Sequence, residues 1–259
     1  MKKYFAIAVM AAAAVTFASC EKDPSGNGGN TDENGFKREW RIKTLDNEYT
    51  YSYDDKGRVA SVVSESDKRT FSYDGNKFTI TNGKTVEYTG TMNADGFVLT
   101  MKSGDEANSW ENTYDSKGFL TSSKLNGTET TRQTAEDGDI LYWCRWDGDN
   151  SFWRRKEATY LDKVNLGCVQ THWAEDVKNT RRWMWEARMF GNTSQHVLES
   201  CVWVNFGDEK AAKTAVYTYE YDNNGLITKE TKYYGVWNET DTTGMDFDDE
   251  HTFTWEKIQ

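Results

Sequence analysis

The chain has 259 residues, with 31 Lys and Arg against 42 Asp and Glu, which gives a formal net charge of −11. This acidic balance argues against a nucleic-acid-binding protein, because a phosphate-backbone binder needs a basic surface. It also opposes electrostatic docking on anionic lipid. No apolar run reaches the roughly 18 residues that a membrane-spanning helix needs.

Residues 1–19 have the features of a secretory signal peptide. Lys2 and Lys3 form a basic start, and an Ala-rich apolar stretch follows up to Ser19. The sequence Phe17-Ala18-Ser19-Cys20 resembles a bacterial lipobox, in which the cysteine is acylated and becomes the mature N-terminus, with Phe17 where Leu is usual. The resemblance predicts lipidation of Cys20 and an acyl anchor in an envelope membrane. An ordinary signal peptide with an incidental cysteine is the alternative.

Residues 20–35 are predicted to form the lipidated cysteine and a flexible tether. Glu21-Lys22-Asp23 resembles the acidic export signal that follows the lipidated cysteine in surface lipoproteins of Bacteroidota. The Gly, Asn and Ser residues that follow are typical of a flexible coil with a reach of roughly 20 Å. We therefore expect an outer-membrane lipoprotein, lipid-anchored and exposed at the cell surface, with residues 36–259 as a single domain.

The chain beyond the leader has few aliphatic residues and many aromatic ones. Leu, Ile, Val and Phe make up roughly 15% of it, a fraction that indicates disorder when the net charge is high. The 11 Trp and the 14 Tyr, all of them beyond the leader except Tyr4, supply the missing apolar area, since each ring can bury roughly 150–250 Å². Pro24 is the only proline, so the turns beyond it are expected to use Gly, Asn and Asp, as tight hairpins do.

A short unit recurs along the chain, with aromatic residues at alternate positions, then Asp or Asn, then Gly. The clearest copy runs from Tyr51 through Asp54 to Arg58. Alternation places the rings on one face of a strand, and the Asp side chain can bond the backbone amides ahead of it. Each unit is therefore a predicted hairpin of roughly 20 residues that must pair with its neighbours. The turn glycines, predicted to have positive φ, are Gly57, Gly96, Gly118 and Gly225.

Hairpins in sequence predict an all-β fold, a long up-and-down antiparallel meander curled into a barrel or half-barrel. Roughly 14–18 short strands are expected, with no helix beyond the leader. A membrane-spanning porin is the alternative, but the strand faces carry Thr, Glu and Lys where such a barrel has lipid-facing apolar residues. The predicted strands include residues 40–45, 58–64, 97–101, 141–145, 181–188, 197–206 and 252–258.

The segment from Tyr51 to Arg58 is similar, position for position, to the Tyr-x-Tyr-Asp-x-x-Gly-Arg motif of the YD repeat in Rhs-type and teneurin-type proteins. The other copies lack the Arg, and the chain is too short for the large shells of those proteins. With its lipobox, tether and hairpin period, the chain more closely resembles small YD-like Bacteroidota lipoproteins, a family of unknown function with a porin-like antiparallel fold. This resemblance implies the fold and supplies no catalytic residue.

Seven of the tryptophans fall within residues 143–203. Exposed Trp rings can stack on sugar faces, so Trp143, Trp146, Trp183 and Trp185 are the candidate ligand-binding residues. Trp183 and Trp185 are predicted to share one face of a strand. The alternative is that these rings form the core that the scarce aliphatic residues cannot build. The sequence leaves open which face of the sheet is wet.

No catalytic residue, metal site or cofactor is predicted. His172, His196 and His251 lie too far apart in sequence for a helical zinc site. The acidic run at 246–250 is interpreted as a solvated turn, with a Ca²⁺ site as the alternative. No Gly-x-Ser-x-Gly elbow and no phosphate-binding loop is present.

Three cysteines remain beyond Cys20. Cys144, Cys168 and Cys201 all occur in strand-like segments, where a free Cys acts as a small core residue. We expect free thiols, while the oxidising envelope would also allow one disulfide.

These features predict a non-enzymatic, surface-tethered envelope lipoprotein that binds a glycan or a partner protein through an aromatic-rich sheet. One alternative is a glycan- or peptidoglycan-active hydrolase, which needs two carboxylates about 5–10 Å apart in a cleft. The other is a purely structural envelope lipoprotein whose rings are all enclosed. The oligomeric state is left open.

Overall fold

The computed structural model describes residues 39–146, 153–167, 169, 180–205, 208–235 and 245–258. No helix among these residues has the length and apolar character needed to cross a membrane. They form β1 (Trp40–Leu45), β2 (Tyr49–Tyr53), β3 (Val59–Val63), β4 (Lys68–Asp74), β5 (Lys77–Asn82), β6 (Thr85–Met92), β7 (Val98–Ser103), β8 (Ser109–Tyr114), β9 (Leu120–Leu125), β10 (Thr128–Glu136), β11 (Asp139–Trp146), β12 (Trp153–Val164), α1 (Arg182–Glu186), β13 (His196–Asn205), β14 (Asp208–Tyr221), β15 (Ile227–Gly235) and β16 (Asp246–Lys257).

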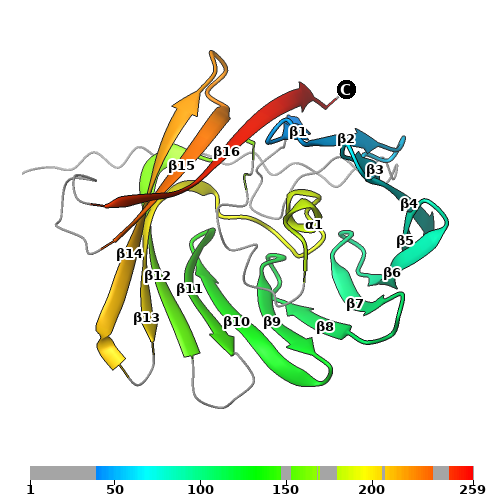
Figure 1. Ribbon diagram of the computed structural model, residues 1–259, viewed down its shortest axis with the longest axis horizontal. Coiled ribbons are helices and arrows are strands. Elements are labelled where there is room, and N and C mark those ends of the chain that lie inside the picture. Colours follow the sequence, from blue (N-terminus) through cyan, green and yellow to red (C-terminus); the bar gives the residue numbers. More distant parts are fainter. Residues whose placement is uncertain are drawn as a thin grey trace, which may run out of the picture.

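The strands form one closed antiparallel barrel (Figure 1). Each strand pairs with the next in sequence, and β16 returns to pair with β1 from Trp40 opposite Lys257 to Leu45 opposite Phe253. The predicted all-β meander is therefore confirmed, and the sheet closes fully rather than stopping as a half-barrel. Closure leaves no sheet edge exposed to other chains.

Four of the hairpin turns share one geometry. In the turn between β8 and β9, Asp115 Oδ1 accepts hydrogen bonds from the backbone N–H groups of Lys117 and Phe119, both at 2.9 Å. The Asp or Asn side chain thus holds the turn, as the motif predicted. The same bonds are made by Asp54, Asn93 and Asp222. The glycines Gly57, Gly96, Gly118 and Gly225 have φ of 77°, 85°, 80° and 82°.

The tyrosine that precedes the turn ties neighbouring hairpins together. The Tyr53 hydroxyl donates to the carbonyl of Ile42 at 2.6 Å, and the Tyr73 hydroxyl donates to that of Val59 at 2.9 Å. Both carbonyls lie at irregularities of the strand register, where the ladder leaves an acceptor available. Burial raises the pKa of both phenols, so they remain neutral donors.

Substituting Gly118 with Ala should destabilise the barrel more than the same change at Gly57. Both residues have positive φ, which costs an Ala side chain roughly 1–2 kcal/mol. A Cβ at Gly118 would also lie 2.8 Å from Phe97 Cε2 and 2.9 Å from Asn192 Nδ2, whereas one at Gly57 meets nothing within 4 Å. We expect Gly118→Ala to lose about 1–3 kcal/mol more in urea unfolding. Equal losses would show that the neighbours move aside freely.

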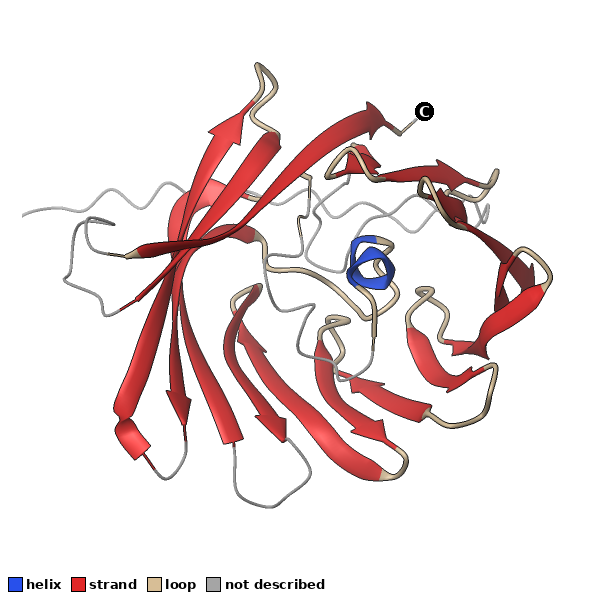
Figure 2. Cartoon of the chain, in the orientation of Figure 1, coloured by secondary structure: helices blue, strands red, loops and turns tan. Residues whose placement is uncertain are grey.

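The barrel lumen is filled by the connection between β12 and β13, of which residues 165–167, 169 and 180–195 are described and are called the plug. Figure 2 shows α1, the helix of the plug, inside the ring of strands. The plug bonds the turns along its path: Val98 N–H donates to Met189 O at 2.7 Å, and Asn192 N–H donates to Gly118 O at 2.8 Å. It shares one apolar core with the inward side chains of the wall, including Phe71, Ile80 and Trp110.

The helix α1 corrects two expectations. Residues 181–188 were expected to form a strand with Trp183 and Trp185 on one face, and no helix was expected beyond the leader. The segment instead begins with a helical turn. Trp183, Met184, Trp185 and Glu186 are all buried, because a helix inside a lumen is enclosed on every side. The alternation of Trp183 and Trp185 is therefore typical of a strand, although the two residues lie on a helix.

The outer wall of the described strands is largely polar, with exposed apolar side chains at Val86, Leu99, Leu141, Val164 and Phe247. On β4, the outward residues Lys68, Thr70, Ser72 and Asp74 alternate with the inward Phe71 and Tyr73. This is the reverse of a membrane barrel, which is apolar outside and polar inside. Cross-strand hydroxyl pairs add to the polar wall and join Thr44 to Thr254, Ser52 to Ser61, Thr91 to Thr100 and Thr113 to Thr121.

Candidate ligand-binding site at the mouth of the barrel

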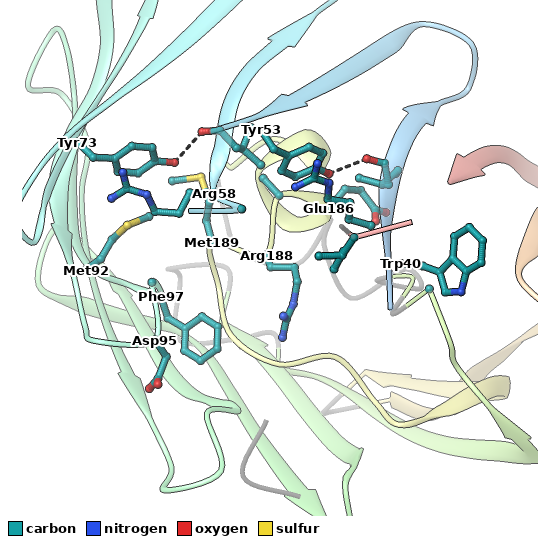
Figure 3. A pocket seen from close by; sticks show the side chains of 18 of the residues that line it. Trp40, Tyr53, Arg58, Tyr73, Met92, Asp95, Phe97, Glu186, Arg188 and Met189 are labelled. Atoms are coloured by element: carbon teal, nitrogen blue, oxygen red, sulfur yellow. Dashed lines mark hydrogen bonds between the residues drawn. The ribbon is translucent and has the colours of Figure 1, made fainter. Parts of the chain in front are cut away.

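A cavity of about 130 Å³ lies at the end of the barrel that carries the glycine turns (Figure 3). We call it the mouth pocket. Its lining comes from β1 to β4, the β6–β7 turn, the plug and the end of β16. A cavity of about 150 Å³ is large enough to hold benzene, so the mouth pocket has room for about one six-membered ring.

Two arginine–tyrosine pairs form one side of the mouth pocket. The Arg41 guanidinium lies 4.0 Å from the centre of the Tyr53 ring, and that of Arg58 lies 3.9 Å from the Tyr73 ring. In each pair the tyrosine hydroxyl bonds the carbonyl of the residue that follows the arginine. The barrel therefore repeats one structural unit, with the arginine held flat on the ring of the next hairpin.

Each of these arginines also has a carboxylate partner. Arg41 Nε donates to Glu256 at 2.6 Å, and Arg58 Nε donates to Asp54 at 2.8 Å. Burial acts to raise the pKa of Asp54, but hydrogen bonds from Arg58 and from the Lys56 amide outweigh it and hold the pKa below its usual value. Asp54 therefore stays ionised and paired in mildly acidic solution.

The plug and the β6–β7 turn supply the rest of the mouth pocket. Figure 3 shows Arg188 extending from the plug between Phe97 on one side and Trp40 on the other. Arg188 is itself hydrogen-bonded to the Asn192 side chain. Asp95 and Glu186 are also among the lining residues. The mouth pocket thus combines ring faces with side chains that donate and side chains that accept hydrogen bonds.

The four predicted ligand-binding tryptophans lie elsewhere. Trp143 is 1% exposed, and Trp183 and Trp185 are each 3% exposed, so these three rings belong to the core. Trp146 is on β11, and its side chain is outside the described residues. None of the four lines the mouth pocket.

The mouth pocket instead takes its rings from Trp40, Tyr53, Tyr73, Phe97 and Trp255. None of these five residues was predicted from the sequence to bind a ligand. One feature of the sequence points to part of this set. The repeat copy from Tyr51 to Arg58, which contains Tyr53, is the only copy that ends in Gly-Arg.

The described histidines are bound to carboxylates. His251 Nδ1 lies 3.0 Å from Asp46 and its Nε2 lies 2.9 Å from Asp249, while His196 Nδ1 lies 2.7 Å from Asp139. Within the described ranges, no group of three or more His, Cys, Asp or Glu side chains is placed to hold a metal ion. His172 lies outside those ranges.

The acidic run and the cysteines have structural settings. Residues 246–250 begin β16, so their interpretation as a turn was wrong, and Asp248 pairs with Lys232 at 2.6 Å. Cys144 and Cys201 are buried thiols, and their Sγ atoms contact the hydroxyl groups of Tyr142 and Tyr217. Cys168, like Cys20 and the predicted tether, is not among the described residues.

No protein-family model matches this chain, and no curated protein matches it either. Among solved structures, it is similar to the crystal structure of a porin-like protein from Bacteroides uniformis ATCC 8492, with a TM-score of 0.64 and 16% sequence identity. The match covers 80% of this chain and 90% of that one. At this identity the likeness concerns the fold alone, and it establishes that the chain has a porin-like antiparallel β-barrel.

Proposed function

We propose that the chain is a non-enzymatic envelope lipoprotein, anchored to the outer membrane through Cys20 and exposed at the cell surface, that binds the terminal sugar of a glycan in the mouth pocket. The observation that carries this proposal is the mouth pocket itself. It has room for about one six-membered ring, and it is bordered by the aromatic side chains of Trp40 and Trp255, while Arg41 and Arg58 lie on the rings of Tyr53 and Tyr73.

The chemistry of the mouth pocket suits a sugar. A pyranose has apolar ring faces, which pack on aromatic side chains, and polar edges, which need both donors and acceptors. Arginines supply the donors, and Asp95 and Glu186 supply acceptors. Apolar pockets with a few convergent polar groups are the usual form of small-molecule sites. The packed lumen also favours binding at the mouth over passage through the barrel.

A glycan-array screen of the chain from Glu21 to Gln259, followed by titration of the hits, tests the proposal. Trp40 is half-buried at the mouth pocket, so Trp40→Ala should weaken binding by about tenfold, the loss of roughly one stacked ring. Phe247→Ala is the matched control, because Phe247 is 61% exposed on β16 and does not line the cavity. Absence of any glycan hit, or equal losses in both variants, would contradict the proposal.

A glycan-active hydrolase is the second candidate, because Asp95 and Glu186 place two carboxylates in the same cavity. The array hits, incubated with the chain and assayed for new reducing ends, separate the two functions. We expect no release beyond the buffer control. Release that disappears in Asp95→Asn or Glu186→Gln would establish the hydrolase instead.

A further inference from the structure

We propose that the mouth pocket selects glycans whose terminal sugar carries a carboxylate, and that Arg41 and Arg58 recognise that group. This inference rests on the proposed function and names its ligand class. It is carried by the two arginine–tyrosine pairs, which have the same construction on two neighbouring hairpins.

Both guanidinium groups have donors to spare. Arg41 uses Nε to bond Glu256, and Arg58 uses Nε and Nη2 to bond Asp54. Within the described part of the chain, their remaining N–H groups make no hydrogen bond. A guanidinium has five N–H donors in one plane. Each arginine can therefore bind a second acceptor on another edge without giving up its first.

The donors are also held in place before any ligand arrives. Each guanidinium lies on a tyrosine ring, and each ring is fixed by its own hydroxyl bond to the wall. The side chains of Arg41 and Arg58 are only 27% and 34% exposed. A side chain that is already ordered loses little conformational entropy on binding. Planar, oriented guanidinium groups are suited to paired hydrogen bonds with a carboxylate.

The charge balance disfavours a ligand with two negative charges. Glu256 and Asp54 match the formal charge of the two arginines, and Asp95 and Glu186 also line the cavity. A dianionic phosphate would therefore be repelled more strongly than a singly charged carboxylate, which is held by oriented donors. The net charge of −11 acts weakly here, because charges beyond a Debye length of about 8 Å are largely screened at physiological ionic strength.

The cavity volume of about 130 Å³ is close to that of a cavity that holds the six carbons of benzene, so it can enclose the carboxylate end of a uronic acid but not an extended chain. Asp95 and Glu186 also line the cavity, and carboxylate oxygens can accept from the hydroxyl groups of the sugar. The expected ligand is thus a chain-terminal hexuronate or a sugar acid of similar size. The remainder of the glycan would lie outside the cavity.

Matched pairs of oligosaccharides test the inference, one ending in glucuronate and the other in glucose, with a galacturonate and galactose pair as replicate. Calorimetric titration of the wild-type chain should show at least about tenfold tighter binding of the acidic member, the value of one charge-assisted hydrogen bond. Arg58→Gln and Arg41→Gln should each weaken binding of the acidic member more than binding of the neutral one, so that most of this preference is lost.

Arg132→Gln is the matched control, because Arg132 is 59% exposed on the outer wall and pairs with Glu129 at 2.7 Å. It makes the same change in charge away from the mouth pocket and should keep the preference. Arg58→Lys retains the charge but not the planar donors, so it should lose the preference as Arg58→Gln does. Arg58→Lys also replaces Arg58→Gln as the test variant if the melting curve of Arg58→Gln shows that it does not fold.

The outcomes separate the two proposals. Equal affinity for the acidic and neutral sugars would overturn the carboxylate inference and leave glycan binding standing. No binding of any sugar would overturn both. A loss of preference in Arg132→Gln as large as in Arg58→Gln would show a general charge effect and would also overturn the inference.

Discussion

Trp183→Ala is expected to lower the free energy of unfolding by about 3–5 kcal/mol, the usual cost of removing a large ring from a packed core. Trp183 is 3% exposed in the lumen. Its ring meets Phe71 edge-on at 5.8 Å, and the Arg69 guanidinium lies 5.2 Å from its centre. The substitution leaves a cavity where the plug joins the wall. Urea unfolding followed by far-UV circular dichroism measures the loss.

Trp40→Ala provides the contrasting substitution, because Trp40 is half-buried at the mouth pocket rather than in the lumen. It should cost less than about 1.5 kcal/mol of stability and act on binding instead. A Trp183→Ala variant with unchanged stability and lost glycan binding would contradict the structure. It would restore the hypothesis that Trp183 belongs to an exposed ligand platform.

Asp46→Ala is expected to cost about 2–4 kcal/mol and to loosen the junction between β1 and β16, because it removes two partly buried hydrogen bonds. Asp46 Oδ1 accepts from the Thr252 backbone N–H at 2.8 Å, and its Oδ2 lies 3.0 Å from His251 Nδ1. The His251 side chain is only 11% exposed. Hydrogen exchange should accelerate in β1 and β16 before it does in the rest of the barrel.

Asp137→Ala controls for the backbone effect of the same substitution. Asp46 and Asp137 have φ of 55° and 51°, so alanine is equally strained at both. In the described structure, no hydrogen bond of the Asp137 side chain corresponds to those of Asp46. The control should lose only about 1–2 kcal/mol and should not change exchange at the junction. Similar exchange in both variants would show that the junction is held by the strand ladder alone.

The repeat could be predicted from the sequence because its contacts join residues only a few positions apart. Asp54, Asp115 and Asp222 bond amides two and four residues ahead, and the glycines need only their own φ. Such contacts are encoded within one short segment. The meander and the polar outer wall follow from these turns and from strict alternation between them.

The helix of the plug could not be predicted from the sequence, because its short pattern of apolar residues fits a strand as well as a helix. Trp183 and Trp185 alternate as strand residues would, and five helical residues carry too little periodicity to decide otherwise. The surroundings decide the outcome. A segment enclosed by the lumen must find hydrogen-bond partners for its backbone within the protein. It can also bury side chains on every face of a helix, as Trp183, Met184, Trp185 and Glu186 are.

The sequence alone determined the hairpins, their turns, the antiparallel order and the placement of the repeat's rings on one face of each strand, because each depends on residues a few positions apart. Only the tertiary structure decided that the sheet closes, that α1 fills the lumen and that Arg41 and Arg58 come to lie on Tyr53 and Tyr73 at one mouth. These features join residues from different hairpins, and their placement depends on how the whole sheet twists and closes.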